Sequence, residues 1–163
     1  MHRGPALRQK SANSPQRNAH FQAQTMLNCT ELIFCRDTVE PDFVTHTLDL
    51  QPTHSYKVGD VVAVGDIQRP SSVGMWKLRL PDSQTDETVE EQLARWLTIL
   101  GTKRERMGRL RQLGYSPYLD CRAEKGSLSL CIEPVVLAGL GTLGIALSVW
   151  LYEAPATEFN ACE

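Results

Sequence analysis

The sequence predicts an α+β fold, a single two-layer domain in which helices cover one face of a mainly antiparallel sheet. Residues 85–114 are the only stretch long and periodic enough to cover a whole sheet, because apolar residues recur there every three or four positions. Residues 75–80 alternate between apolar and charged side chains, as a half-buried strand does. Several other short apolar segments are bounded by proline and glycine, and these are expected to supply the rest of the sheet.

The chain is expected to divide into a disordered basic tail (1–26), one folded domain (27–154) and a flexible C-terminus (155–163). The tail has almost no large apolar residue and no acidic residue, so it cannot bury enough surface to offset the cost of ordering. An organellar targeting segment, or a true translation start at Met26, are the alternatives. Every Asp and Glu lies from Glu31 onward, and an acidic domain is a poor match for a nucleic-acid binder.

The cysteines favour a reducing cytoplasm. There are five of them, an odd number, with no CxxC pair and no apolar signal-like stretch near the start of the chain. A disulfide framework is therefore not expected.

The domain is expected to begin with a strand at 31–36, which is rich in β-branched and aromatic residues. Pro41 suits the first turn of the helix that follows, because that position needs no backbone N–H donor. Val44 and Leu48 are expected on the buried side of this helix, and Pro52 lies beyond its end.

Two loops and two strands are predicted next. Residues 53–60 are expected to form a loop that leads into a strand at 61–64. A second loop at 65–74 precedes the alternating strand at 75–80. Loops on a rigid sheet are where binding residues usually lie, so these two loops are candidates for a contact surface.

The helical stretch 85–114 is predicted to be two helices in tandem. Gly101 suits a left-handed position at the end of the first helix. Thr102 and Glu105, three residues later, predict a capping box at the start of the second helix, and Gly114 ends that helix.

A hairpin is expected next, with strands at 118–123 and 127–132. Alternation along these strands directs Cys121 and Cys131 to opposite faces, so the two thiols should not bridge.

Residues 134–152 carry no charge and have the length of a membrane span. Three glycines interrupt them and neither flank carries Lys or Arg, so we expect a packed structure instead. Pro134 opens a short buried helix, Gly144 ends it, and 145–152 form a central strand.

Several motifs resemble chemical sites, but each lacks part of what its site requires. Residues 139–144 match GxGxxG, but these glycines end a helix instead of opening one, so no dinucleotide cofactor is expected. His46 and Asp49 lie one helical turn apart, so both could face one site. Two ligands are too few for a metal site, however. The three tryptophans are expected to be core residues, and stacking on a ligand is the second interpretation. The basic cluster interpreted as a solvated helix face is Lys103, Arg104, Arg106, Arg109 and Arg111.

The chain also resembles a known family. The segment from Tyr56 to Asp60 (aromatic, Lys, x, Gly, Asp), the Gly-x-Trp at Gly74 and the prolines that open two helices resemble the bacterial domain of unknown function 4279. This resemblance covers about residues 31–153, with a basic extension ahead of it and Tyr56 in place of the family's Trp. It implies a small α+β protein without established catalytic residues, some relatives of which are thought to be binding or immunity-type proteins.

The function expected is that of a cytoplasmic, non-catalytic, immunity-like domain that binds another protein through the open sheet face or the 53–60 and 65–74 loops. The alternative is a small-ligand binder or enzyme with a pocket beneath those loops; a nucleic-acid binder comes third. No metal, cofactor or membrane contact is expected, and a homo-oligomer is left open. The residues expected to contact the partner or ligand are His54, Tyr56, Lys57, Asp60, Arg69 and Trp76.

Overall fold

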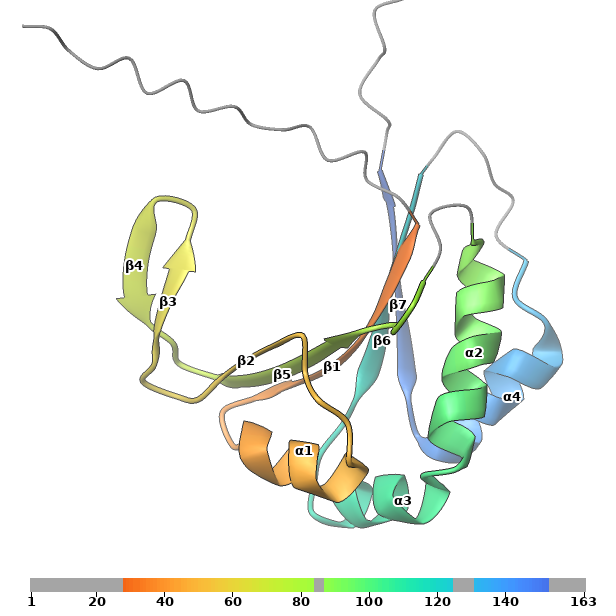
Figure 1. Cartoon of the computed structure of the whole chain (residues 1–163), viewed down its shortest axis with the longest axis horizontal. Helices are drawn as coiled ribbons and strands as arrows, with labels where there is room; N and C mark the ends of the chain where they lie inside the picture. Colours follow the sequence, from red (N-terminus) through yellow and green to blue (C-terminus); the bar gives the residue numbers. More distant parts are fainter. Residues whose placement is uncertain (1–27, 84–86, 125–130, 153–163) are drawn as a thin grey trace, which may run out of the picture.

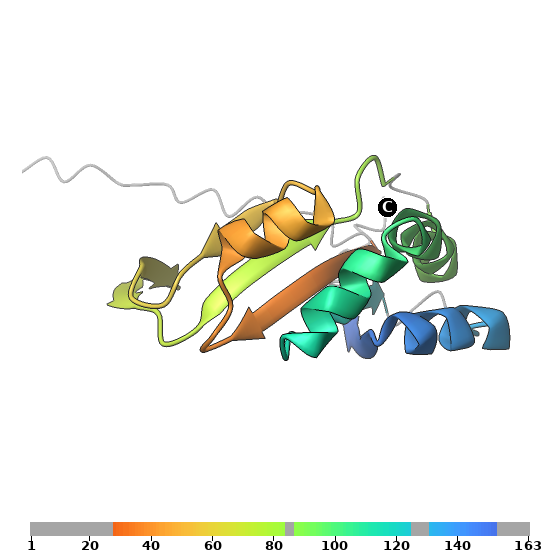
Figure 2. The same cartoon turned by 90° about the horizontal axis from the view of Figure 1, so that it is seen from below.

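The computed structural model describes residues 28–83, 87–124 and 131–152. They form a five-stranded sheet with helices on one face and a separate two-stranded hairpin at one end (Figures 1 and 2), which confirms the predicted α+β domain. In chain order the elements are β1 (Cys29–Arg36), α1 (Pro41–Leu48), β2 (His54–Tyr56), β3 (Val61–Val64), β4 (Ile67–Pro70), β5 (Gly74–Arg79), α2 (Val89–Gly101), α3 (Arg104–Gln112), β6 (Tyr118–Glu124), α4 (Pro134–Leu143) and β7 (Ala146–Tyr152).

The sheet has the strand order β2-β5-β1-β6-β7, so the first strand of the chain lies at its centre. β1 is antiparallel to both of its neighbours, and β2 is antiparallel to β5. β7 is parallel to β6, because the chain between them crosses the helical layer through α4. The sheet is therefore mainly antiparallel, with one parallel pair at its edge.

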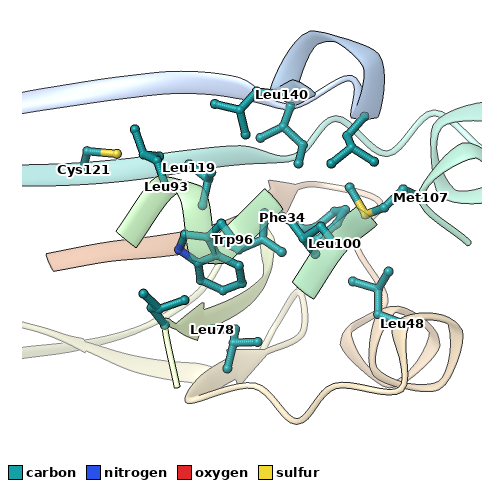
Figure 3. Close-up of a cluster of buried hydrophobic side chains, with 14 of the residues drawn as sticks. Phe34, Leu48, Leu78, Leu93, Trp96, Leu100, Met107, Leu119, Cys121 and Leu140 are labelled. Carbon is teal, nitrogen blue, oxygen red and sulfur yellow. The ribbon is translucent and has the colours of Figure 1, made fainter. Parts of the chain in front are cut away.

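The core lies between the sheet and the helices. Leu32 and Phe34 alternate along β1 and both point into this layer, where they are no more than 1 % exposed. Trp96 of α2 is fully buried among apolar side chains of the sheet and helices (Figure 3). The apolar stripe predicted for α2 is confirmed, since Val89, Leu93, Trp96 and Leu100 are all 0 % exposed.

A polar network crosses this core. Trp96 Nε1 donates to Thr30 Oγ1 at 2.8 Å, and Thr30 Oγ1 donates in turn to Gln92 Oε1 at 2.9 Å. Gln92 Nε2 donates to the backbone carbonyl of Asn28 at 3.1 Å. Thr30, Gln92 and Trp96 are all 0 % exposed, so each needs these partners in place of water.

Two helices in tandem occur as predicted, but the break lies at 102–103 and the capping predicted for it is wrong. Gly101 is the last residue of α2 and does not have the positive φ of the predicted left-handed position. Thr102 has helical dihedral angles and its hydroxyl donates back to the carbonyl of Ile99, so it cannot act as an N-cap. The capping box lies at the other end of α2, where the Thr88 side chain accepts from the backbone N–H of Glu91 and the Glu91 carboxylate accepts from that of Thr88.

The two predicted loops contain strands. Residues 53–60 include the short strand β2, which extends the sheet beside β5. Residues 65–74 include β4, which pairs with β3 as a hairpin around Gly65. Both strands are mostly exposed, so the apolar pattern by which a strand is recognised is weak in them.

The uncharged stretch 134–152 folds as predicted into α4, a stop at Gly144 with φ 69° and a strand, β7. No helix of the described ranges is both long and apolar enough to cross a membrane. The prediction of a central strand is wrong, because β7 is the last strand of the sheet that the described residues form.

The second arm of the predicted hairpin, 127–132, lies largely outside the described residues, and its last two residues are not in a strand. Cys121 is buried and Cys131 exposed, and both are free thiols, as predicted.

Candidate binding surface on the open face of the sheet

The helices cover only one face of the sheet, and we call the opposite one the open face. In Figure 1 the sheet curves so that the β3–β4 hairpin and the far ends of β6 and β7 rise on this side, away from the helices. No helix of the described part of the chain packs against it (Figures 1 and 2). Side chains that point away from the core are therefore displayed together here.

Strand register assembles the open face from segments that are distant in the sequence. Directly opposed residues on neighbouring strands project to the same face. Ile33 of β1 is opposite Lys77 of β5 and Tyr118 of β6, and Lys77 is in turn opposite His54 of β2. Further along the strands, opposed residues place Arg79, Glu31, Asp120 and Ser148 in one row and Cys29, Arg122 and Trp150 in the next.

A cluster of charges lies at the centre of this face. Glu31 is 3 % exposed and its Oε2 atom lies 3.2 Å from Lys77 Nζ and 3.7 Å from Arg122 Nη2. Its other oxygen, Oε1, lies 3.7 Å from Arg79 Nε. Arg122 also donates to Asp120 Oδ2 at 3.2 Å. Three cations thus surround two nearly buried carboxylates.

The buried carboxylate of Glu31 is incompletely satisfied. Although Lys77 and Arg122 lie near Oε2, no donor of the described residues reaches this atom with hydrogen-bond geometry. A buried charge is stable only if its partners are well placed. Glu31 therefore keeps these cations close to the sheet, but its imperfect pairing lowers the stability of the fold. The cations remain accessible, since the side chains of Lys77, Arg79 and Arg122 are 25 %, 56 % and 42 % exposed.

Two hollows adjoin on the open face. The first, of about 640 Å³, lies over β1, β5, β6 and β7. The second, of about 690 Å³, lies between β2 and the β3–β4 hairpin, and the two share Met75. The first is lined by Ile33, Met75, Lys77, Tyr118, Asp120, Arg122, Ser148 and Trp150. The second is lined by His54, Ser55, Tyr56, Asp60, Val61, Val62, Ala63 and Met75.

Four titratable groups of this face have pKa values that their surroundings raise. Burial raises the pKa of the Tyr118 phenol and of the Cys35 thiol, and burial together with the charge of Glu31 raises that of Cys29. Burial opposes the positive charge of Arg122, but the carboxylates of Glu31 and Asp120 outweigh it and raise its pKa. The thiols and the phenol are therefore neutral at pH 7, which makes them poor nucleophiles.

The structure brings together only some of the residues predicted from sequence. His54, Tyr56 and Asp60 line the second hollow, where the rings of His54 and Tyr56 are 5.6 Å apart in an edge-to-face arrangement. Lys57 instead forms an ion pair with Asp42 of α1 at 2.6 Å, which raises its pKa.

The remaining two predicted site residues do not line either hollow. Arg69 is exposed on β4. Trp76 is 0 % exposed in the core, and its Nε1 donates to Thr45 Oγ1 at 2.9 Å. The prediction that Trp76 is a core residue is therefore confirmed.

Sequence reasoning missed the charged centre and Trp150. The sequence predicts Trp150 in the core, yet it is 62 % exposed, because it projects from an edge strand onto the face that no described helix covers. The available signal was the polar side of each alternating strand, such as Lys77 in β5 and Asp120 with Arg122 in β6. Alternation gives each strand's outer residues, but only the strand order shows that they meet.

The fold and this surface define a small two-layer α+β domain with one uncovered, charged and hollowed sheet face. A family model for a domain of unknown function, DUF4279, matches residues 24–154, and the chain belongs to this family. Comparison with curated proteins and with solved structures found no match.

Proposed function

We propose that this protein is a non-catalytic binding domain that holds a partner protein on the open face of its sheet. The observation that carries this proposal is the composition of that face, where an exposed Trp150 stands beside Arg122 and Tyr118. Trp, Tyr and Arg are the residues that most often dominate the energy of protein interfaces. A surface of this kind, on a rigid sheet, can bind tightly without any conformational change.

The partner is expected to offer acidic groups next to an apolar side chain. Of the five charged side chains in the cluster, the two carboxylates are almost buried and the three cations are partly exposed. The accessible charge at the centre is therefore positive, even though the whole chain has a formal net charge of −2. Affinity for such a partner should fall as salt is raised, because exposed charges are screened.

The raised pKa values of Cys29, Cys35 and Tyr118 support binding over catalysis, since none of these groups is activated at neutral pH. The free thiols at the four described cysteines agree with the reducing cytoplasm that we propose as its location.

A small-ligand binder is the second candidate, favoured by the size of the hollow that His54, Tyr56 and Asp60 line. Its volume of about 690 Å³ lies in the range of small-molecule pockets. Such pockets enclose most of the ligand, however, whereas both hollows lie on a face that no described helix covers. The open geometry supports a protein partner more strongly.

The test compares two apolar positions outside the core, half-buried Met75 and exposed Leu137, that receive the same change. Met75→Glu places a negative charge where the two hollows meet, and Leu137→Glu places one on α4, where Leu137 is 49 % exposed. Both variants and the wild type serve as bait for quantitative crosslinking capture from cells of the source organism. We expect Met75→Glu to weaken capture of the same partner roughly 10- to 100-fold, and Leu137→Glu to leave it unchanged.

Equal capture by all three baits would refute the open face as the binding surface. Failure of any protein to bind, together with a thermal-shift response to a small molecule that Tyr56→Ala abolishes, would favour the ligand candidate. If the captured partner is a toxin encoded beside this chain, the immunity-like form of the function is supported.

A further inference from the structure

β7 (Ala146–Tyr152) is an edge strand of the sheet formed by the described residues. Within the described residues it pairs with β6 on one side and with no strand on the other. Natural edge strands are usually shortened, charged, bulged or interrupted by proline to prevent pairing with other chains. β7 is seven residues long and contains neither a charge nor a proline. Its outer edge therefore offers backbone N–H and C=O groups to another strand.

The side chains of β7 are also poorly covered. Three consecutive residues, Val149, Trp150 and Leu151, are 39 %, 62 % and 60 % exposed. Their alternation places Trp150 on the open face and Val149 and Leu151 on the side of the helices. A strand that is exposed and apolar on both of its faces is expected to be covered by another surface.

The opposite edge of the sheet is different. β2 is only three residues long, and both of the residues before Tyr56 are polar. The chain leaves β2 for the β3–β4 hairpin, which rises at that end of the sheet (Figure 1). Short polar edges are the ordinary protected kind, so the two ends of this sheet are not equivalent.

We propose that β7 pairs antiparallel with β7 of a second copy of this chain, so that two five-stranded sheets join into one. Residues 134–152 carry no charge, so two copies can approach along this edge without repulsion between like charges. An antiparallel pair of identical strands has two-fold symmetry, which covers both β7 edges at once and leaves only the short β2 edges outside. The assembly therefore closes as a dimer.

Dimerisation would unite the two open faces. Trp150 and Ser148 line the first hollow and project from β7, so the hollows of the two copies would meet beside the symmetry axis. Each copy would thereby bring its own Trp150 to the edge of its neighbour's hollow. This inference does not rest on the proposed function, because the pairing uses the edge of β7 whatever the open face binds.

The test is the oligomeric state of the full chain, measured by sedimentation velocity over a range of concentrations. Val149→Lys and Leu151→Lys add charges at the proposed contact on the helix side of β7, and so leave the open face intact. Val135→Lys is the matched control, because Val135 is 68 % exposed on α4. We expect the wild type and the control to be dimers, and each β7 variant to dissociate at least about tenfold more readily.

A wild type that stays monomeric at about 100 µM, or β7 variants that dimerise like the control, would overturn the proposal. Hydrogen exchange of the wild type provides a measurement that does not depend on whether the variants fold. Backbone amides of β7 should exchange more slowly at high than at low protein concentration. Exchange of β7 that is the same at every concentration would also contradict the dimer.

Discussion

Replacing Thr30 with valine removes one hydroxyl that serves two buried partners. Thr30 Oγ1 accepts a hydrogen bond from Trp96 Nε1 at 2.8 Å and donates one to Gln92 Oε1 at 2.9 Å. Valine has almost the same shape as threonine, so the substitution opens no cavity. It leaves an indole N–H and an amide oxygen unpaired in a site that is 0 % exposed.

The expected cost follows from counting these groups. A buried polar group that loses its partner costs about 1 to 3 kcal/mol, so with two such groups Thr30→Val should lower the free energy of unfolding by about 2 to 6 kcal/mol. Thr45→Val is the matched control, because Thr45 Oγ1 accepts only from Trp76 Nε1. Thr45 is partly accessible to water, so this change should cost about 1 kcal/mol.

Urea unfolding followed by tryptophan fluorescence measures both values, and thermal unfolding checks them at about 3 to 6 °C per kcal/mol. A Thr30→Val cost no larger than that of Thr45→Val would show that the network does not depend on the shared hydroxyl, and would refute this prediction. An unchanged slope of the free energy against urea is needed in both variants, so that the difference reports stability alone.

Two further predictions concern close packing and thiol chemistry. Gly74→Ala should destabilise the domain by about 3 kcal/mol or more in urea unfolding, because the added Cβ would lie 2.1 Å from the backbone oxygen of Val39. Gly108→Ala in α3, where nothing lies within 4 Å of the added Cβ, should instead stabilise it by about 0.5 to 1 kcal/mol; equal effects would contradict this account. Burial raises the pKa of Cys121 from 9.0 to about 12, so the folded state favours the neutral thiol. The neutral thiol costs the fold nothing below pH 9, and the domain loses stability only as the pH rises from 9 toward 12. In native protein at pH 8, iodoacetamide should label the exposed Cys131 and spare Cys121 until denaturant is added; mass spectrometry of the peptides distinguishes the two, and early labelling of Cys121 would refute its burial.

Local patterns were sufficient for the class of fold and for most buried faces. The alternation at 75–80 correctly placed Trp76, Leu78 and Leu80 inside, and the helical period of α2 placed Trp96 there. These signals hold because period and turn chemistry depend on residues that are neighbours in the chain. Spacing alone is not sufficient at a helix end: Leu113 lies three residues after the buried Leu110, yet it is 57 % exposed because α3 ends at Gln112.

The sequence by itself determined that this is an α+β domain, which faces of β5 and α2 are buried, and that the uncharged stretch 134–152 breaks at Gly144. Only the tertiary structure decided that β7 is an edge strand, that Trp150 is exposed, and that Glu31 meets Lys77 and Arg122. The physical reason is that a strand's own residues fix which face is apolar, whereas its neighbours are chosen by packing and hydrogen bonding between segments far apart in the chain.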